Sequence, residues 1–343
     1  MRTSACIMLC LTLAGPLSAA TKKPITKQKP KSKTSSTIYV KGTAQLPGDN
    51  GVINQAYTMG KDNQLNFNLL SAEYTAGRLN IGTTTYYPGE NDKAILLRFA
   101  VQNPNPKETL MRFDSFMVTA IDSKSTNYDW CRNILKQGDK ESYSVELKPG
   151  QKVELLSFIV VPKDANIPKF MVSHYSGGKV LRYDTKPFLK AVPAPYNDPE
   201  DKTGSVMLSN VPGKPDIYYP QHNFDLKFVS GKYVSEKIGD REPGENKRFF
   251  VATITFKNAV NGEQLYRFDT FHGKVTTPGN DSYESIQDLL KGGRDESAEA
   301  QLAPGGEYTG RMLFEIGKDE QIKTVTLWEN DSRKISFDIS NVK

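Results

Sequence analysis

The sequence has few of the side chains that most often build catalytic and metal sites. Its 343 residues include three cysteines and three histidines, which are His174, His222 and His272. It contains no HExxH, CxxC or GxSxG pattern, no glycine-rich phosphate loop and no EF-hand loop. We therefore expect a protein that is not an enzyme and that uses no cofactor and no metal ion.

Long apolar runs are also missing. The only candidate, Ala5–Ala14, is shorter than the roughly 18 residues that a membrane-spanning helix needs. Arg2 precedes this run and small residues ending at Ala20 follow it, which is typical of a signal peptide cut after Ala20. The sequence thus predicts an exported protein, secreted, periplasmic or in the cell envelope, that does not span a membrane. Cleavage would leave Cys131 as the only cysteine, so no intramolecular disulfide is expected.

Positive charge is concentrated in one short segment. The formal net charge is +6, but residues 21–37 carry six lysines and no acidic residue, and Arg2 lies in the predicted signal peptide. The rest of the chain is then close to neutral, at about −1. The charge therefore predicts a solvated basic tail, either a plain spacer or a contact for anionic surface polymers, and it does not predict nucleic-acid binding by the folded part.

The chain contains an internal repeat at a constant offset of 155 residues. One shared motif is Arg-Phe-Asp, at residues 112–114 and again at 267–269. The same offset relates four further pairs, which are PGEN at 88–91 and 243–246, Asn103 and Asn258, the Leu-x-Pro-Gly turns at 147–150 and 302–305, and Lys-Asp at 163–164 and 318–319. A single offset for five motifs indicates two copies of one module.

Within each copy the apolar residues alternate with a period of two. In the first, Leu97, Phe99 and Val101 fall on one face of a predicted strand, and residues 250–258 repeat the pattern in the second. Further strands are expected at 153–161, 179–184, 310–316 and 334–339. One short helix per copy is expected, over residues 132–136 and 287–291, each followed by glycine.

These motifs, in this order, resemble secreted bacterial immunoglobulin-like modules of unknown function, a family that includes immunoprotective extracellular antigens. The resemblance implies an all-β fold of two tandem immunoglobulin-like antiparallel β-sandwiches, and it implies no functional residues. We expect a signal peptide at 1–20, a basic flexible tail at 21–38, module 1 at 39–186, a proline-rich linker at 187–203 and module 2 at 204–343.

Two groups of residues are candidate binding sites. The repeated pairs Arg112 with Asp114, and Arg267 with Asp269, would form polar recognition spots if they projected from one side of a strand, or plain structural ion pairs. The second group consists of tyrosines that precede prolines, which either stack on sugars or pack loops onto the sandwich: Tyr86, Tyr87, Tyr218 and Tyr219.

The sequence favours a non-catalytic exported protein of the cell envelope that binds or scaffolds through the loops or edges of its sandwiches. Its expected partner is another envelope protein or a polysaccharide. Two alternatives stay open: an extracellular enzyme with a dispersed site between the modules, and a purely structural spacer.

Overall fold

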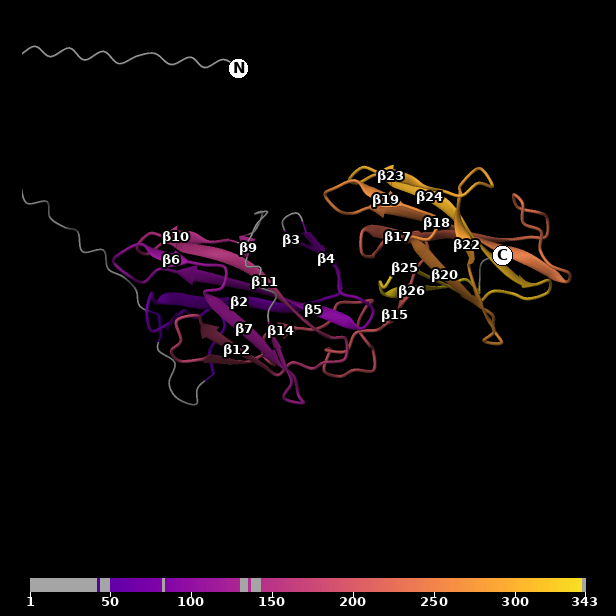
Figure 1. Ribbon diagram of the computed structural model, residues 1–343. Helices are drawn as coiled ribbons and strands as arrows, with labels where there is room; N and C mark the ends of the chain where they lie inside the picture. Colours follow the sequence, from indigo (N-terminus) through magenta and orange to yellow (C-terminus); the bar gives the residue numbers. More distant parts are fainter. Residues whose placement is uncertain (1–41, 44–49, 82–83, 130–134, 137–142, 341–343) are drawn as a thin grey trace, which may run out of the picture. The chain divides into compact units, whose positions relative to one another are not determined.

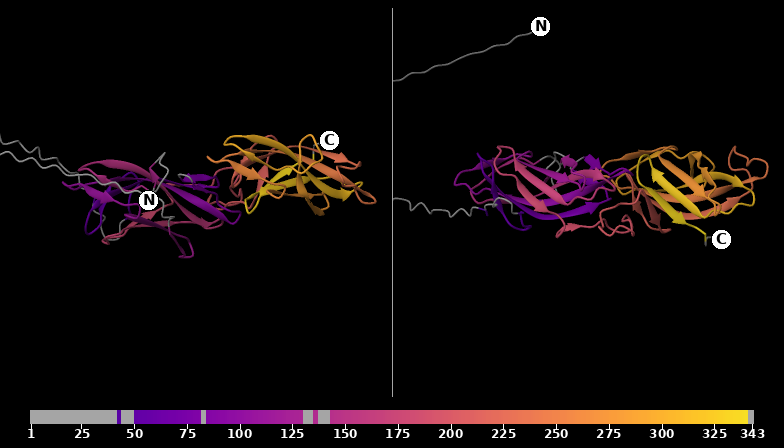
Figure 2. Two further views of the ribbon diagram at one scale, coloured as in Figure 1. Left: turned by 45° about the horizontal axis from the view of Figure 1, so that its top comes forward. Right: turned by 90° about the horizontal axis from the view of Figure 1, so that it is seen from below.

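The computed structural model describes residues 42–43, 50–81, 84–129, 135–136 and 143–340. The predicted signal peptide, the basic tail and Cys131 lie outside these residues. Within the described ranges the protein is all-β, with antiparallel sheets and no helix (Figures 1 and 2). Residues 39–343 belong to one compact unit.

Module 1 has two main sheets. The first has the order β1-β2-β5-β11-β9, from Tyr57–Met59, Leu65–Thr75, Asp92–Gln102, Lys152–Pro162 and Leu135–Lys136. The second has the order β13-β12-β7-β8, from Leu181–Asp184, Lys169–His174, Phe116–Ile121 and Asn127–Asp129. Phe67 on β2 packs against Phe116 on β7, with ring centroids 5.1 Å apart, so the two sheets enclose one core. Two short antiparallel strand pairs complete the module: β3 (Leu79–Ile81) with β4 (Thr84–Tyr86), and β6 (Thr109–Met111) with β10 (Val145–Leu147).

Module 2 repeats the order of the main strands, with one additional strand, β15 (Asn210–Gly213), which pairs in parallel with β26 (Lys334–Asp338). Figure 1 shows the strands of both modules. Its first sheet, β16-β17-β18-β24-β22, comes from Tyr219–Pro220, Phe224–Val234, Lys247–Asn258, Glu307–Gly317 and Ile286–Lys291. Its second sheet, β15-β26-β25-β20-β21, comes from Asn210–Gly213, Lys334–Asp338, Thr324–Glu329, Phe271–Thr276 and Ser282–Glu284. The antiparallel pair of β19 (Gln264–Tyr266) and β23 (Ala300–Leu302) matches that of β6 and β10.

The repeated asparagines explain why the two copies fold alike at one corner. Asn103 is fully buried and its Nδ2 donates to the carbonyls of Lys107 and Leu147, at 2.7 and 2.8 Å. Asn258 makes the same two bonds, to Gly262 and Leu302, both at 2.8 Å. Each side chain thus ties the end of a long strand to the turn that follows and to the Leu-x-Pro-Gly turn.

The predicted short helices are wrong where the structure describes them. Residues 286–291 form strand β22, which pairs with β24 through a register shift between Ile286 and Leu290. Leu289 and Leu290 are both buried, but they join different apolar clusters. Adjacent side chains that point to opposite sides are a property of a strand, because successive residues alternate between its two faces. In module 1, Leu135 and Lys136 form strand β9, and residues 132–134 lie outside the described ranges.

The segment 187–203, predicted as a linker, packs against module 1. It contains strand β14 (Leu189–Lys190), which pairs in parallel with β2. Val192 and Tyr196 are buried in the core that includes module 1 residues.

Candidate functional site

The repeated Arg-Phe-Asp motif lies in a turn between two strands in both modules, and not in a strand as the sequence argument assumed. Arg112 Nε lies 3.0 Å from Asp114 Oδ1, and Arg267 Nε lies 3.7 Å from Asp269 Oδ1. All four side chains are at least 40% exposed. Ion pairs this exposed contribute little to stability.

The four tyrosines proposed as binding residues do not come together on one exposed face. Tyr87 and Tyr219 are buried, and Tyr86 stacks on Phe158 with ring centroids 4.9 Å apart. The Tyr87 hydroxyl donates to the carbonyl of Pro220 at 3.0 Å, and burial raises the pKa of Tyr87 to about 12. Tyr218 is partly exposed beneath Lys227, whose Nζ lies 4.8 Å from the ring centroid. These contacts favour a packing role for the tyrosines over sugar stacking.

Charged side chains are buried where the modules meet, which is where the enzyme alternative places its site. Arg333 is fully buried and donates to four carbonyls, those of Gly89, Glu90, Asp92 and Leu208. Arg78 forms an ion pair of 3.1 Å with Asp225 and donates to the carbonyls of Gln221, His222 and Phe224. Backbone acceptors therefore occupy most of the donors of both guanidinium groups.

Two further ionisable groups near this junction are also held by backbone groups. The Glu329 carboxylate accepts from the amides of Asn223 and Phe224 at 3.0 to 3.1 Å, and burial raises the pKa of Glu329 to about 7. Lys93 Nζ donates to the carbonyls of Lys163, Ala165 and Ser205, and burial lowers the pKa of Lys93 to about 7. Perturbed pKa values are also found at functional sites. Here the backbone hydrogen bonds of Glu329 and Lys93 favour a structural role for both side chains.

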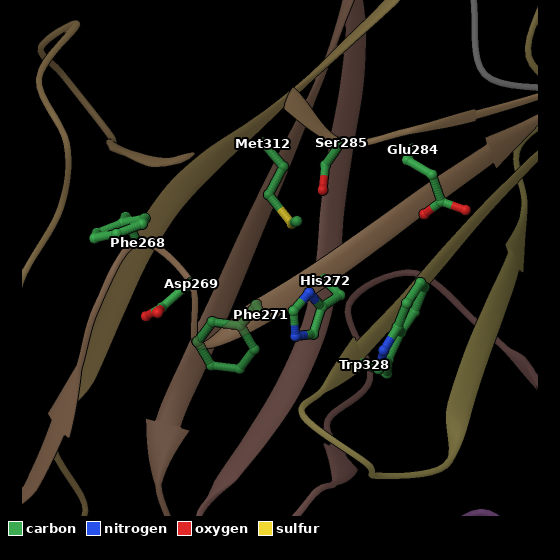
Figure 3. A pocket seen from close by; sticks show the side chains of 8 residues that line it. All are labelled: Phe268, Asp269, Phe271, His272, Glu284, Ser285, Met312 and Trp328. Atoms are coloured by element: carbon green, nitrogen blue, oxygen red, sulfur yellow. The ribbon is translucent and has the colours of Figure 1, made fainter. Parts of the chain in front are cut away.

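A cavity lined by aromatic, carboxylate, hydroxyl and imidazole side chains lies in module 2 (Figure 3). Its volume is about 370 Å³, and two other cavities, of about 420 and 400 Å³, lie beside β1 and beside Tyr74. Its lining combines buried apolar groups with exposed polar ones: Phe268, Asp269, Phe271, His272, Glu284, Ser285, Met312 and Trp328. We call it the Trp328 pocket.

The topology explains why these residues meet. The chain leaves the second sheet at β21 and crosses to the first sheet as β22, so the residues at the crossover close one side of the pocket. Phe271 and Met312, which are 3% and 2% exposed, come from the facing sheets and form its apolar base. Figure 3 shows Glu284 and Ser285 on one side of the pocket and Phe268 with Asp269 on the other.

An aromatic row crosses the outer face of the second sheet at this pocket. His272 on β20 is the register partner of Trp328 on β25, and their rings stack with centroids 5.7 Å apart and an interplanar angle of 28°. Lys334 on β26 places its Nζ 5.4 Å from the centroid of the Trp328 ring, which is a cation–π distance. The row therefore holds the indole between an imidazole and an ammonium group.

Module 1 has the same backbone register without this chemistry. Met117 and Ser173 are register partners on β7 and β12, as His272 and Trp328 are on β20 and β25. The pairs are related by the repeat offset of 155 residues. A shared scaffold thus carries the aromatic row in one copy alone.

Sequence reasoning identified Asp269 as a candidate but missed His272, Trp328 and Glu284. Module 1 has Met117 at the position of His272, so the motifs shared by the two copies did not indicate this histidine. Applying the offset to the whole chain would have found Trp328, one of two tryptophans, opposite Ser173 of the other copy. The contact between His272 and Trp328 has no local signal, because 56 residues of sequence separate the two strand positions.

Neither a metal site nor a membrane span is found within the described ranges. No group of three or more His, Cys, Asp or Glu side chains there is placed to hold a metal ion. No helix there has the length and apolar character needed to cross a membrane.

Comparison with known proteins finds relatives of undefined function. Residues 225–333, which contain the Trp328 pocket, match the family model described as "Domain of unknown function (DUF4352)". Curated proteins gave no match.

Three solved structures illustrate what the chain is similar to. An uncharacterized β-sandwich protein from Clostridium difficile 630 is 10% identical, with 38% of this chain and 96% of that chain covered, at a TM-score of 0.28. The secreted protein MPT63 from Mycobacterium tuberculosis is 14% identical, with 38% and 97% covered, at 0.29. A putative lipoprotein, ycdA, from Bacillus subtilis is 7% identical, with 60% and 73% covered, at 0.28. Likenesses at these TM-scores transfer no activity, ligand or compartment to this chain.

Proposed function

We propose that the protein is an exported, non-catalytic binding protein of the bacterial cell envelope, built from two immunoglobulin-like β-sandwiches. Module 2 binds the envelope partner through the Trp328 pocket, and module 1 supports it. The observation that carries this proposal is a difference between the copies: Asn103 and Asn258 keep the same buried hydrogen bonds, whereas His272 and Trp328 replace Met117 and Ser173 on an outer face.

The proposal follows from how each kind of residue contributes. Buried strand and turn residues must be kept if a fold is to be kept, and Asn103 and Asn258 are examples. Exposed residues such as His272 are not required for the fold, and an aromatic group beside a cavity is a common anchor for a ligand. A pure spacer needs no such difference between its two copies.

The enzyme alternative has less support at the junction of the modules. Arg333, Arg78 and Glu329 hold backbone groups there, which gives each of them a structural task. A spacer remains the competing reading, and it predicts that the partner-binding residues can be changed without consequence.

The signal peptide and the basic tail give the proposal its location. An apolar run behind Arg2 that ends at Ala20 would direct export, and six lysines in residues 21–37 would add attraction to anionic surface polymers. This attraction is electrostatic, so salt weakens it, whereas binding in a partly apolar pocket persists.

Cosedimentation with the insoluble envelope fraction of the producing bacterium tests the proposal. The exported chain should bind in about 1 M salt, where the screening length is about 3 Å. Trp328→Ser, which installs the module 1 residue, should abolish this salt-resistant binding, and Tyr175→Ser, which removes a 42% exposed tyrosine outside the pocket, should not. Equal binding by the wild type and Trp328→Ser would overturn the proposed function.

A further inference from the structure

We infer that the ligand of the Trp328 pocket is a neutral saccharide unit, of one or two rings, displayed by an envelope polymer. This inference rests on the proposed function and names the chemical class that the pocket would take. It is carried by three properties of the pocket: its mixed surface, its paired charges and its size.

The surface of the pocket has both apolar faces and hydrogen-bonding groups, in close alternation. Phe271 and Met312 form the base, and Phe268 provides a half-buried ring on one side. Glu284 and Ser285 supply carboxylate and hydroxyl oxygens on the other side (Figure 3). A pyranose ring has the matching form, because its C–H groups make apolar faces and its hydroxyls project from its rim.

The charges around the pocket favour a neutral ligand over an ionic one. Asp269 is paired with Arg267, and Glu284 is the register partner of Lys274 on the neighbouring strand. A basic residue therefore lies near each carboxylate of the lining: Arg267 in an ion pair with Asp269, and Lys274 at the strand position opposite Glu284. A cationic or an anionic ligand would meet a like charge close to every opposite charge, whereas hydroxyl groups donate to one member and accept from the other.

Trp328 lines the pocket, where Figure 3 shows its ring edge-on, and its indole N–H can donate a hydrogen bond. Both neighbours of the ring are occupied, by His272 through stacking and by Lys334 through the cation–π contact. This arrangement fixes the indole and leaves the exposed His272 imidazole beside the cavity. A fixed aromatic donor costs little conformational entropy on binding.

The size of the pocket limits the ligand to a short unit. A cavity of about 370 Å³ lies near the lower end of the range of about 300 to 1,000 Å³ for small-molecule sites. We therefore expect one or two rings to enter, with any remaining polymer in solvent. We expect one such unit to bind weakly, with a Kd on the order of 1 mM, and multiple copies of the unit on a polymer would add avidity.

NMR of the indole N–H groups of the full exported chain tests the inference. The sequence has two tryptophans, so the spectrum has two indole signals, and Trp328→Phe identifies which belongs to Trp328. The probes are glucose, galactose, mannose, N-acetylglucosamine, cellobiose and diacetylchitobiose. At least one should shift the Trp328 signal saturably below about 20 mM.

Two variants make the result specific to the pocket. His272→Met, which installs the module 1 residue at an exposed position, should weaken binding at least tenfold, and Met117→His in module 1 should leave it unchanged. The thermal unfolding midpoint of each variant shows whether it is folded. If no probe shifts the Trp328 signal, the saccharide inference is overturned, even if Trp328→Ser still abolishes envelope binding and so upholds the proposed function. If envelope binding does not depend on Trp328, the proposed function itself fails.

Discussion

Replacement of Arg333 by methionine is the most informative test of how the two modules are held together. The Arg333 side chain is fully buried, and its guanidinium donates to four carbonyls of residues 89, 90, 92 and 208. Three of these acceptors belong to module 1, whereas Arg333 belongs to module 2. The side chain therefore joins the modules by a buried, charged hydrogen-bond donor.

The expected loss in the free energy of unfolding depends on the carbonyl groups that lose their donor. A hydrogen bond from a charged donor contributes about 1.5–3 kcal/mol, but four bonds to one group are not additive. Removing one partner of a buried charged network costs about 3–5 kcal/mol, because the groups that remain are buried without a partner. Methionine fills similar space and donates nothing, so we expect Arg333→Met to lower the free energy of unfolding by about 3–5 kcal/mol.

Urea unfolding of the full exported chain, followed by circular dichroism, measures this cost. Arg267→Met is the matched control, because the Arg267 side chain is 50% exposed and its ion pair should contribute less than about 1 kcal/mol. A loss below about 1 kcal/mol in Arg333→Met, or a loss equal to that of the control, would refute the idea that this arginine holds the junction.

Three further predictions concern buried polar groups. Burial raises the pKa of Glu329 from 4.5 to about 7, so between these pH values the native state keeps a proton that the unfolded chain releases. The contribution of Glu329 to the free energy of unfolding therefore falls as pH rises from 4.5 to about 7, by up to about 1.4 kcal/mol per pH unit. Glu329→Gln should flatten this pH dependence of the free energy of unfolding, measured by urea titrations at several pH values. An unchanged pH dependence would contradict the assignment to Glu329. Burial lowers the pKa of Lys93 from 10.5 to about 7, so the unfolded chain binds more protons than the native state between these pH values, and the free energy of unfolding should rise from pH 7 to 10.5. Lys93→Met should lack this rise in the same titrations. A rise that persists in Lys93→Met would have to come from other groups. Asn103→Ala and Asn258→Ala should each lower the free energy of unfolding in urea by about 1–3 kcal/mol, because each removes a buried amide that donates to two carbonyls. A large effect in one module alone would contradict the equivalence of the two corners.

The strands could be predicted from the sequence because their signals are local and repeated. Alternation around Leu97, Phe99 and Val101 reports a strand with a buried face, and those three side chains are fully buried in β5. The 155-residue offset then transferred each element to the second copy, where β18 and β24 lie at the expected positions.

The short helices could not be judged from their local sequence. The run Gln287–Lys291 has the composition of a helical turn, but β22 lies at the edge of the first sheet with apolar clusters on both of its sides. Burial of Leu289 and Leu290 in opposite directions needs an extended chain, and this tertiary packing overrides helix propensity.

The Trp328 pocket was only partly predictable for a different reason. Its residues come from the turn before β20, from β20 itself, from the end of β21, and from β24 and β25, which are brought together by the strand crossover. Comparison of the two copies is the one sequence signal that bears on it, because His272 and Trp328 replace Met117 and Ser173 at paired positions. Exposed differences between repeated modules therefore deserve the same scrutiny as the shared motifs.

Envelope binding by Trp328→Ser and His272→Met in about 1 M salt tests most directly whether module 2 binds through its pocket. Both variants carry the module 1 residue at their position, and their folding is verified by unfolding midpoints. We predict that the wild type cosediments with the envelope fraction and that both variants lose at least nine tenths of this binding, roughly a tenfold change in affinity. Wild-type levels of binding by folded Trp328→Ser would contradict a role for the pocket and would leave the spacer as the better description of the protein.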